Sequence, residues 1–181
     1  MDPVSRYARV LSLIGAATGL ASVLFPWWTL RWTWSGGFFV SSVFLYGNRV
    51  EGSLAGLGIE SLQAVSTDAY DFTWFSLGFI IIAVAGTVFG ALRASRIQAS
   101  LLASTFFYIA GSVVFLGGLS SVLSDQGRTI FSSVTVTFMG STSTVDSGLS
   151  IGFYLNLLAI LLVAGSYFSS RRKKVRRGSL C

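Results

Sequence analysis

The 181-residue sequence contains no histidine, one cysteine, two prolines and few charged residues, which make up 11% of the chain. Haem, copper, zinc and iron–sulfur sites draw mainly on His and Cys ligands, so we expect no cofactor and no metal. A Ser-His-Asp or Cys-His catalytic arrangement is excluded, and a disulfide within the chain is excluded as well. The apolar stretches also lack carboxylates for general acid–base work. We therefore expect a protein that is not an enzyme.

Apolar residues are correspondingly abundant, at 52% of the chain, and the mean hydropathy is +0.71. A soluble domain carries roughly 25% charged residues. Four stretches without Asp, Glu, Lys or Arg are long enough to cross a bilayer as helices, at about 10–27, 73–92, 97–120 and 149–168. The sequence predicts a single integral membrane domain over residues 1–181, built on a four-helix transmembrane bundle.

Charge is distributed unevenly about these spans. The N-terminus, the turn between spans two and three, and the tail 169–181 together carry a charge of +9, whereas the loops 28–72 and 123–148 carry −3. Positive residues stay in the cytoplasm, so we expect a multi-pass protein of the cell membrane with both termini cytoplasmic. The tail acts as a topology anchor or also binds anionic headgroups, through Arg171, Arg172, Lys173, Lys174, Arg176 and Arg177. Because the basic residues are concentrated there, no nucleic-acid surface is expected.

Small and polar residues within the spans indicate helix packing. Gly15 and Gly19 in the first span, and Gly86 and Gly90 in the second, are spaced four residues apart. Such pairs allow close approach of helix backbones in lipid. Packing within the bundle is favoured over a dimer interface. Asn156 is expected to form a hydrogen bond to a neighbouring helix.

The two outer loops have β character. Leu30, Trp32 and Trp34 alternate along 29–34, a Ser-Gly-Gly turn follows, and 38–46 is rich in β-branched and aromatic residues, which predicts a hairpin. In 129–138, Val134, Val136 and Phe138 alternate with Thr135 and Thr137, as in a half-buried strand. We expect this strand to pair with the hairpin in a small extracellular antiparallel sheet.

Two further expectations concern the segment before the second span and the tryptophans at the outer ends of the first two spans. Residues 50–70 approximate a helical apolar stripe and predict a short amphipathic helix, with Leu54, Leu57, Leu62 and Val65 on one side. Trp27, Trp28 and Trp74 fall at the outer ends of the first two spans. Tryptophan is enriched at membrane–water interfaces, so these three are expected to form an interfacial belt.

Four spans, cytoplasmic ends, a long β-rich first outer loop, a short inner turn and a second outer loop resemble the superfamily of claudins and peripheral myelin proteins. Trp32 or Trp34 takes the place of the leading Trp of that family's first-loop motif, whereas its Gly-Leu-Trp and its two Cys have no counterpart. The resemblance implies a left-handed four-helix bundle capped by a small sheet. The lack of disulfides and of Asn-x-Ser/Thr sequons favours a prokaryotic origin.

The predicted function is a non-catalytic four-span scaffold, either a claudin-like adhesion and self-assembly protein or an accessory subunit of a larger membrane complex. Its expected partners are membrane lipids and other membrane proteins or copies of itself. Exposed apolar surface marks interaction sites, and the predicted contact residues are Trp32, Trp34, Phe38, Phe39, Phe44, Tyr46, Thr135 and Thr137. The alternative is an oligomeric channel or a small-solute transporter component. Span residues without ionisable groups argue against a monomeric ion path.

Overall fold

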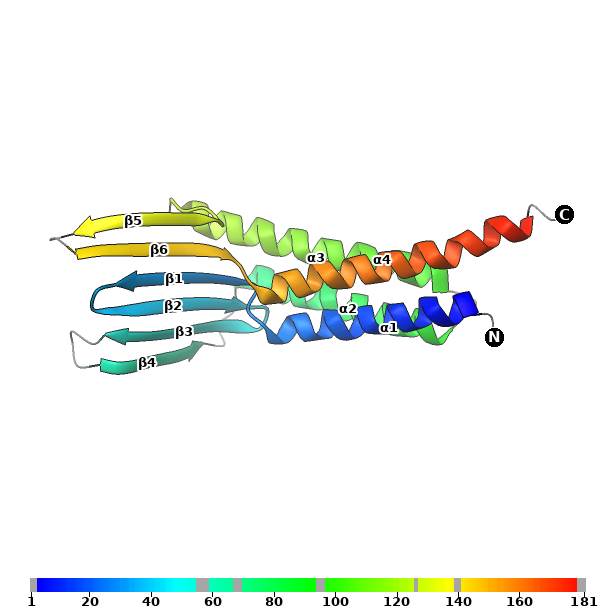
Figure 1. The fold of residues 1–181 in the computed structure, drawn as a ribbon, viewed down its shortest axis with the longest axis horizontal. Coiled ribbons are helices and arrows are strands. Elements are labelled where there is room, and N and C mark those ends of the chain that lie inside the picture. Colours follow the sequence, from blue (N-terminus) through cyan, green and yellow to red (C-terminus); the bar gives the residue numbers. More distant parts are fainter. Residues whose placement is uncertain are drawn as a thin grey trace.

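A computed structural model of the chain describes residues 3–54, 59–66, 70–93, 97–125, 127–138 and 141–178. Its helices form an elongated bundle, and its strands continue from one end of that bundle as a sheet (Figure 1). The helix α1 starts, and α4 finishes, at the end of the bundle away from the sheet (Figure 1). In chain order the elements are α1 (Pro3–Leu24), β1 (Trp28–Trp34), β2 (Gly37–Phe44), β3 (Gly47–Leu54), β4 (Ile59–Ser66), α2 (Asp71–Leu92), α3 (Ile97–Asp125), β5 (Ser132–Phe138), β6 (Ser141–Leu149) and α4 (Ile151–Gly178).

The four helices are long and apolar enough to cross a membrane, which confirms the four predicted spans at the level of length and composition. Their ends differ from the predicted ones. α1 finishes at Leu24, two residues before Pro26, because proline disfavours helical backbone in the residue before it. α3 continues to Asp125, beyond the predicted end. α2 begins at Asp71, where the carboxylate interacts favourably with the helix dipole.

Each helix of the bundle packs beside two others. The contacts join α1 to α2, α2 to α3, α3 to α4, and α4 back to α1. Buried positions recur every three or four residues, as on the inner side of α3 at Ser104, Tyr108, Ser112 and Phe115. This spacing places them on one face of a helix. The opposite faces of the helices carry exposed apolar residues, as expected of helices in lipid.

The strands form one six-stranded sheet in the order β4-β3-β2-β1-β6-β5, and every neighbouring pair is antiparallel. Both loop regions contribute, as expected. The predicted hairpin is confirmed as β1 and β2, joined at Ser35 and Gly36. The strand predicted in 129–138 is β5. It pairs with β6 and not with the hairpin, and it is β6 that pairs with β1.

The amphipathic helix predicted over residues 50–70 is wrong, because this segment contributes β3 and β4, which pair with each other and extend the sheet beyond β2. Gly52 is buried, and a Cβ there would lie 2.9 Å from the backbone oxygen of Phe38 on β2. Glycine destabilises a helix interior but permits this close approach between strands. In this segment, strand pairing therefore determines the secondary structure, and the helical spacing of the apolar residues does not.

Candidate interaction surface and its attachment to the bundle

Trp27 attaches the sheet to the bundle. Its side chain is fully buried and donates a hydrogen bond from Nε1 to the Ser22 carbonyl at 2.9 Å. The indole makes edge contacts with Phe115 of α3 at 5.0 Å and with Phe153 of α4 at 5.6 Å between ring centroids. Because three elements converge on one large ring, the orientation of the sheet relative to the helices is fixed by packing.

Backbone hydrogen bonds reinforce this junction. Trp27 N–H donates to the Val43 carbonyl of β2 at 2.8 Å, and the Trp27 carbonyl accepts from Ser150 N–H at 2.9 Å. Gly152 N–H donates to the Pro26 carbonyl at 2.8 Å. A Cβ on Gly152 would lie 2.5 Å from the Phe25 carbonyl oxygen and 2.6 Å from the Trp27 ring. Only glycine allows the start of α4 to approach the chain this closely.

The burial of Trp27 and Trp28 corrects the predicted interfacial belt. Trp28 is 5% exposed and donates from Nε1 to the Ile130 carbonyl at 3.0 Å. Both rings therefore belong to the protein core. Trp74, at the start of α2, is 51% exposed and has the exposure that an interfacial residue requires.

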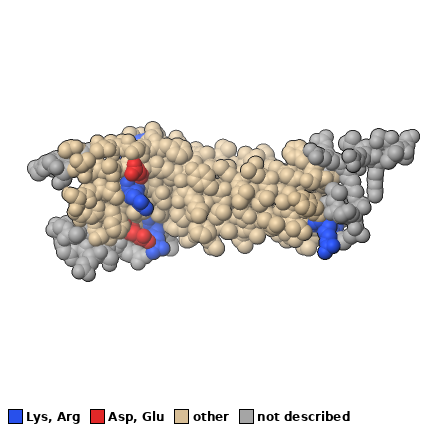
Figure 2. Space-filling view, in the orientation of Figure 1, with Lys and Arg blue, Asp and Glu red and all other residues tan. Residues whose placement is uncertain are grey.

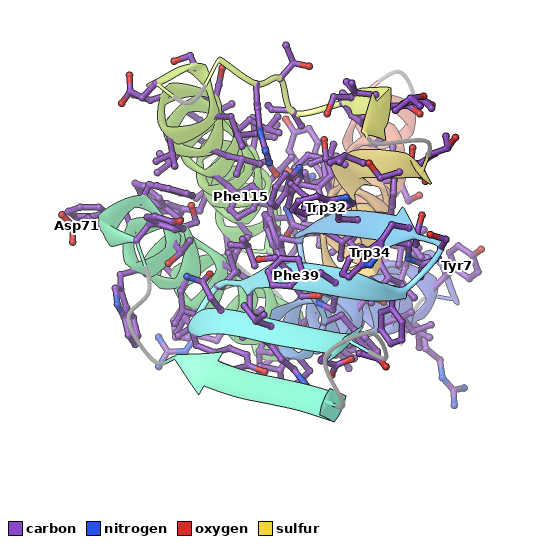
Figure 3. All side chains as sticks on the ribbon, turned by 90° about the vertical axis from the view of Figure 1, so that its left-hand side faces the viewer. Tyr7, Trp32, Trp34, Phe39, Asp71 and Phe115 are labelled. Atoms are coloured by element: carbon purple, nitrogen blue, oxygen red, sulfur yellow. The ribbon has the colours of Figure 1, made fainter. Side chains whose placement is uncertain are left out.

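The register divides the sheet into an apolar face and a polar face, since directly opposed residues on antiparallel strands share a face. On β1 every second residue lies on the apolar face, namely Trp28, Leu30, Trp32 and Trp34. Phe39 of β2, Val145 of β6 and Val134 of β5 occupy the same row as Trp32. Figure 3 shows Trp32, Trp34 and Phe39 near one another on the neighbouring strands β1 and β2, viewed from the sheet end of the molecule.

Exposure on this apolar face rises from Trp28 to Trp32 of β1 and falls again at Trp34, which is half-buried. Trp28 is 5% exposed, Leu30 is 9% exposed, and Trp32, two residues further out, is 46% exposed. Trp32 packs edge-on against Trp34, with centroids 5.6 Å apart. The inner part of the apolar face is thus core, and in its outer part Trp32 is partly exposed to solvent. Val134 is 50% exposed, which corrects its predicted inward packing; the side chains of Val136 and Phe138 lie outside the described residues.

The predicted contact residues consequently fall into two groups. Trp32, Trp34 and Phe39 lie on the apolar face, and Phe39 is half-buried against the core. The other group lies on or beside the opposite face: Phe38 and Phe44 of β2, Thr135 and Thr137 of β5, and Tyr46 in the β2–β3 turn. Among the aromatic residues, Phe38 and Tyr46 are each 44% exposed.

The polar face carries the described charges of the sheet. Arg49 forms an ion pair with Glu51, Arg31 lies opposite Asp146 in the register, and Ser133 Oγ donates to Asp146 Oδ1 at 2.7 Å. Figure 2 shows charges near the sheet and at the far end of the bundle, with an uncharged surface between them. Within the part of the chain that the structure describes, no three His, Cys, Asp or Glu residues gather where they could hold a metal ion.

Polar side chains inside the bundle form hydrogen bonds between helices. Asn156 of α4 is fully buried and donates from Nδ2 to Ser112 Oγ of α3 at 2.8 Å, which confirms its predicted role. Ser166 of α4 donates to the Ala8 carbonyl of α1 at 2.6 Å. Ser100 of α3 donates to the Gly86 carbonyl of α2 at 2.5 Å. These bonds join each of the four helices to a neighbour.

The predicted packing glycines lie at close contacts within the chain. A Cβ on Gly15 would lie 2.8 Å from Val163 Cγ2 of α4, and one on Gly19 would overlap the Tyr108 ring of α3. Gly86 and Gly90 face Ser104 and Ser100 of α3 in the same way. The predicted basic anchor lies on α4, whose backbone runs to Gly178, but its side chains are outside the described residues.

Comparison with known protein families and with curated proteins finds no match to this sequence.

Proposed function

We propose that the protein is a non-catalytic four-span membrane scaffold that engages copies of itself or other membrane proteins through its β-sheet. The observation that carries the proposal is the exposed outer part of the apolar face, where Trp32 is 46% exposed although Trp28, on the same strand face, is buried. Trp32 packs against Trp34 but keeps nearly half of its surface exposed. A large apolar surface left uncovered marks an interaction site, and tryptophan is enriched in binding hot spots.

The proposed topology places the sheet outside the cell and both termini in the cytoplasm. The charge asymmetry between the two sides supports it, since Lys and Arg accumulate on the cytoplasmic side. The uncharged band between the two charged ends of the molecule matches the hydrocarbon layer (Figure 2). The claudin-like arrangement, four helices with a sheet at one end, is part of the same proposal and rests on layout alone.

An oligomeric channel or small-solute transporter component is the alternative function. The described polar groups of the spans favour the scaffold, because Asn156, Ser166 and Ser100 form hydrogen bonds between helices. Solute flux through liposomes containing the purified protein separates the two functions. Flux above that of empty liposomes supports the channel and contradicts the scaffold.

Native mass measurement after gentle detergent extraction tests the scaffold directly. We expect a particle larger than one chain. The variant Trp32→Ser should shift the particle towards smaller species, whereas Trp74→Ser, which removes a tryptophan of similar exposure from α2, should leave it unchanged. A wild-type protein that is monomeric in native membranes, shown by in-membrane cross-linking, contradicts the proposed function.

A further inference from the structure

The two edges of the sheet run in opposite directions. The edge strands are β4 and β5, and because six strands alternate in direction, β5 runs outward from the bundle and β4 runs back towards it (Figure 1). The edges lie on opposite borders of the molecule (Figure 1). An edge strand presents unpaired backbone N–H and C=O groups to any suitable strand beside it.

Membrane insertion restricts how two copies can meet. The strands run along the same long axis as the helices (Figure 1), so in a membrane they stand close to the bilayer normal. Copies in one membrane are related by rotation about that normal, which leaves strand directions unchanged. Two β5 edges in one membrane are therefore parallel to each other, whereas β5 of one copy and β4 of the next are antiparallel, which continues the pattern of the sheet.

We propose that β4 of one copy pairs with β5 of a neighbouring copy in the same membrane, so that the sheet continues from chain to chain. This inference rests on the proposed function, identifies the partner as a second copy, and adds the two sheet edges to the apolar face around Trp32 as contact surfaces. The contact is head-to-tail, because the two surfaces that meet are different. Such contacts generate closed rings or open chains instead of isolated dimers.

The composition of the two edges is compatible with this pairing. β5 contains no charged residue and no proline, and its register with β6 is continuous. Natural edge strands that avoid association usually carry a lysine, a proline or a bulge, and β5 has none of these. β4 contains one charged residue, Glu60, so no like charges oppose each other across the proposed junction.

The register gives the expected alignment. Leu62 of β4, Trp32 of β1 and Val134 of β5 lie in one row across the sheet. Ala64 of β4 and Ser132 of β5 lie in the row next to it on the same face. When neighbouring copies stand at equal height in the membrane, Leu62 meets Val134 of the neighbour and Ala64 meets its Ser132. The apolar face then continues across the junction.

Cysteine cross-linking in native membranes tests the pairing. In a Cys181→Ser background, the pair Leu62→Cys with Val134→Cys is treated with a short thiol-specific cross-linker, and Ala64→Cys with Ser132→Cys serves as a second pair. Both pairs should give a ladder of dimers, trimers and larger species. The matched control is Leu62→Cys with Thr135→Cys, which should cross-link far less because Thr135 lies on the opposite face.

Single-cysteine variants distinguish the alternatives. Leu62→Cys alone and Val134→Cys alone should give no cross-linked species under denaturing conditions, because each cysteine lacks its counterpart on the neighbouring copy. A dimer of Val134→Cys alone overturns the proposal in favour of pairing between two β5 edges. A homo-oligomeric native particle with no ladder from either pair overturns the edge pairing and leaves the scaffold function standing. A monomeric particle overturns both.

Discussion

Asn156 of α4 and Ser112 of α3 are joined by a hydrogen bond of 2.8 Å between Nδ2 and Oγ. Asn156 is fully buried, and Ser112 is 6% exposed. The same Nδ2 lies 3.5 Å from the Tyr108 carbonyl one turn away on α3. The amide of Asn156 thus contacts two successive turns of α3. These contacts specify the position of α4 along the axis of α3.

This relationship predicts a modest, coupled loss of stability. Hydrogen bonds between membrane helices contribute about 0.6 kcal/mol on average and at most about 2 kcal/mol. Asn156→Leu and Ser112→Ala should therefore each lower the midpoint of thermal unfolding in detergent. The double variant should lose less than the sum of the two, since both remove the same bond. Strictly additive losses would show that the two side chains do not interact.

Two adjacent glycines of α3 give a sharper contrast. A Cβ on Gly118 would overlap the ring of Phe72, whereas one on Gly117 would meet nothing within 4 Å. Phe72 cannot move freely, because it stacks on Tyr70 and contacts Phe115. Gly118→Ala should lower the free energy of unfolding by about 1–3 kcal/mol through overpacking. Gly117→Ala should raise it by up to about 1 kcal/mol through helix propensity.

Equilibrium unfolding of the two variants in the same detergent provides the measurement. The residues are neighbours and the substitutions are identical, so differences in lipid or detergent exposure contribute little to the comparison. Equal effects at both positions would mean that α2 and α3 do not approach each other at Phe72 as the structure places them.

The helices could be predicted from the sequence because their signal is local. About 20 consecutive apolar residues without charge identify a span whatever the rest of the chain does. The alternation of Leu30, Trp32 and Trp34 and the Ser35–Gly36 turn likewise identified β1 and β2. The ends of the spans were less well predicted, because Trp27 is apolar and adjoins α1, yet belongs to the junction with the sheet.

The strands missed by the sequence depend on distant partners. β6 is largely Ser and Thr and has no apolar alternation over Ser141–Thr144; its place between β1 and β5 supplies the backbone hydrogen bonds that define it. The segment that forms β4 and part of β3 predicts a helix because Leu54, Leu57, Leu62 and Val65 approximate helical spacing. Strand context overrides such patterns, because pairing and burial decide β structure more than intrinsic preference does.

The candidate surface was identified by residue type but not by face. The sequence singled out its aromatic residues, but only the register shows that Trp32 and Phe38 lie on opposite faces of the sheet. The gradient of burial from Trp28 to Trp32 depends on where the bundle ends, which no local pattern records.

The proposed orientation predicts an accessibility pattern in intact cells. Ser35 lies exposed in the turn between β1 and β2, at the end of the sheet far from the bundle. In a Cys181→Ser background, Ser35→Cys should react with a membrane-impermeant thiol reagent added outside. The native Cys181 should react only after the membrane is permeabilised. Labelling of Cys181 in sealed cells would reverse the orientation.

The basic residues of α4 provide a second test of orientation. Replacing all six of Arg171, Arg172, Lys173, Lys174, Arg176 and Arg177 by Gln removes most of the positive charge excess on the side proposed to be cytoplasmic. We expect a fraction of the chains to insert α4 incorrectly, because Lys and Arg flanking a span set its direction. The fraction is measured by protease protection of a C-terminal tag. Replacing Arg31 and Arg49 instead, on the other side, should leave α4 correctly inserted.

The last prediction separates the folding role of β1 from its contact role. Trp28 and Trp32 lie on the same face of one strand, but Trp28 is 5% exposed and donates to the Ile130 carbonyl, whereas Trp32 is 46% exposed. Trp28→Ala should destabilise the protein by about 3–5 kcal/mol, as expected for a large buried aromatic. Trp32→Ala should cost much less, because much of the ring is already in solvent. Thermal unfolding of both variants, with Trp28→Phe as the intermediate case, provides the comparison. Since the chemistry of the two substitutions is identical, a loss at Trp32 as large as that at Trp28, measured on single chains in dissociating detergent, would mean that Trp32 is covered within the chain, and the surface proposed for partner contact would be part of the core.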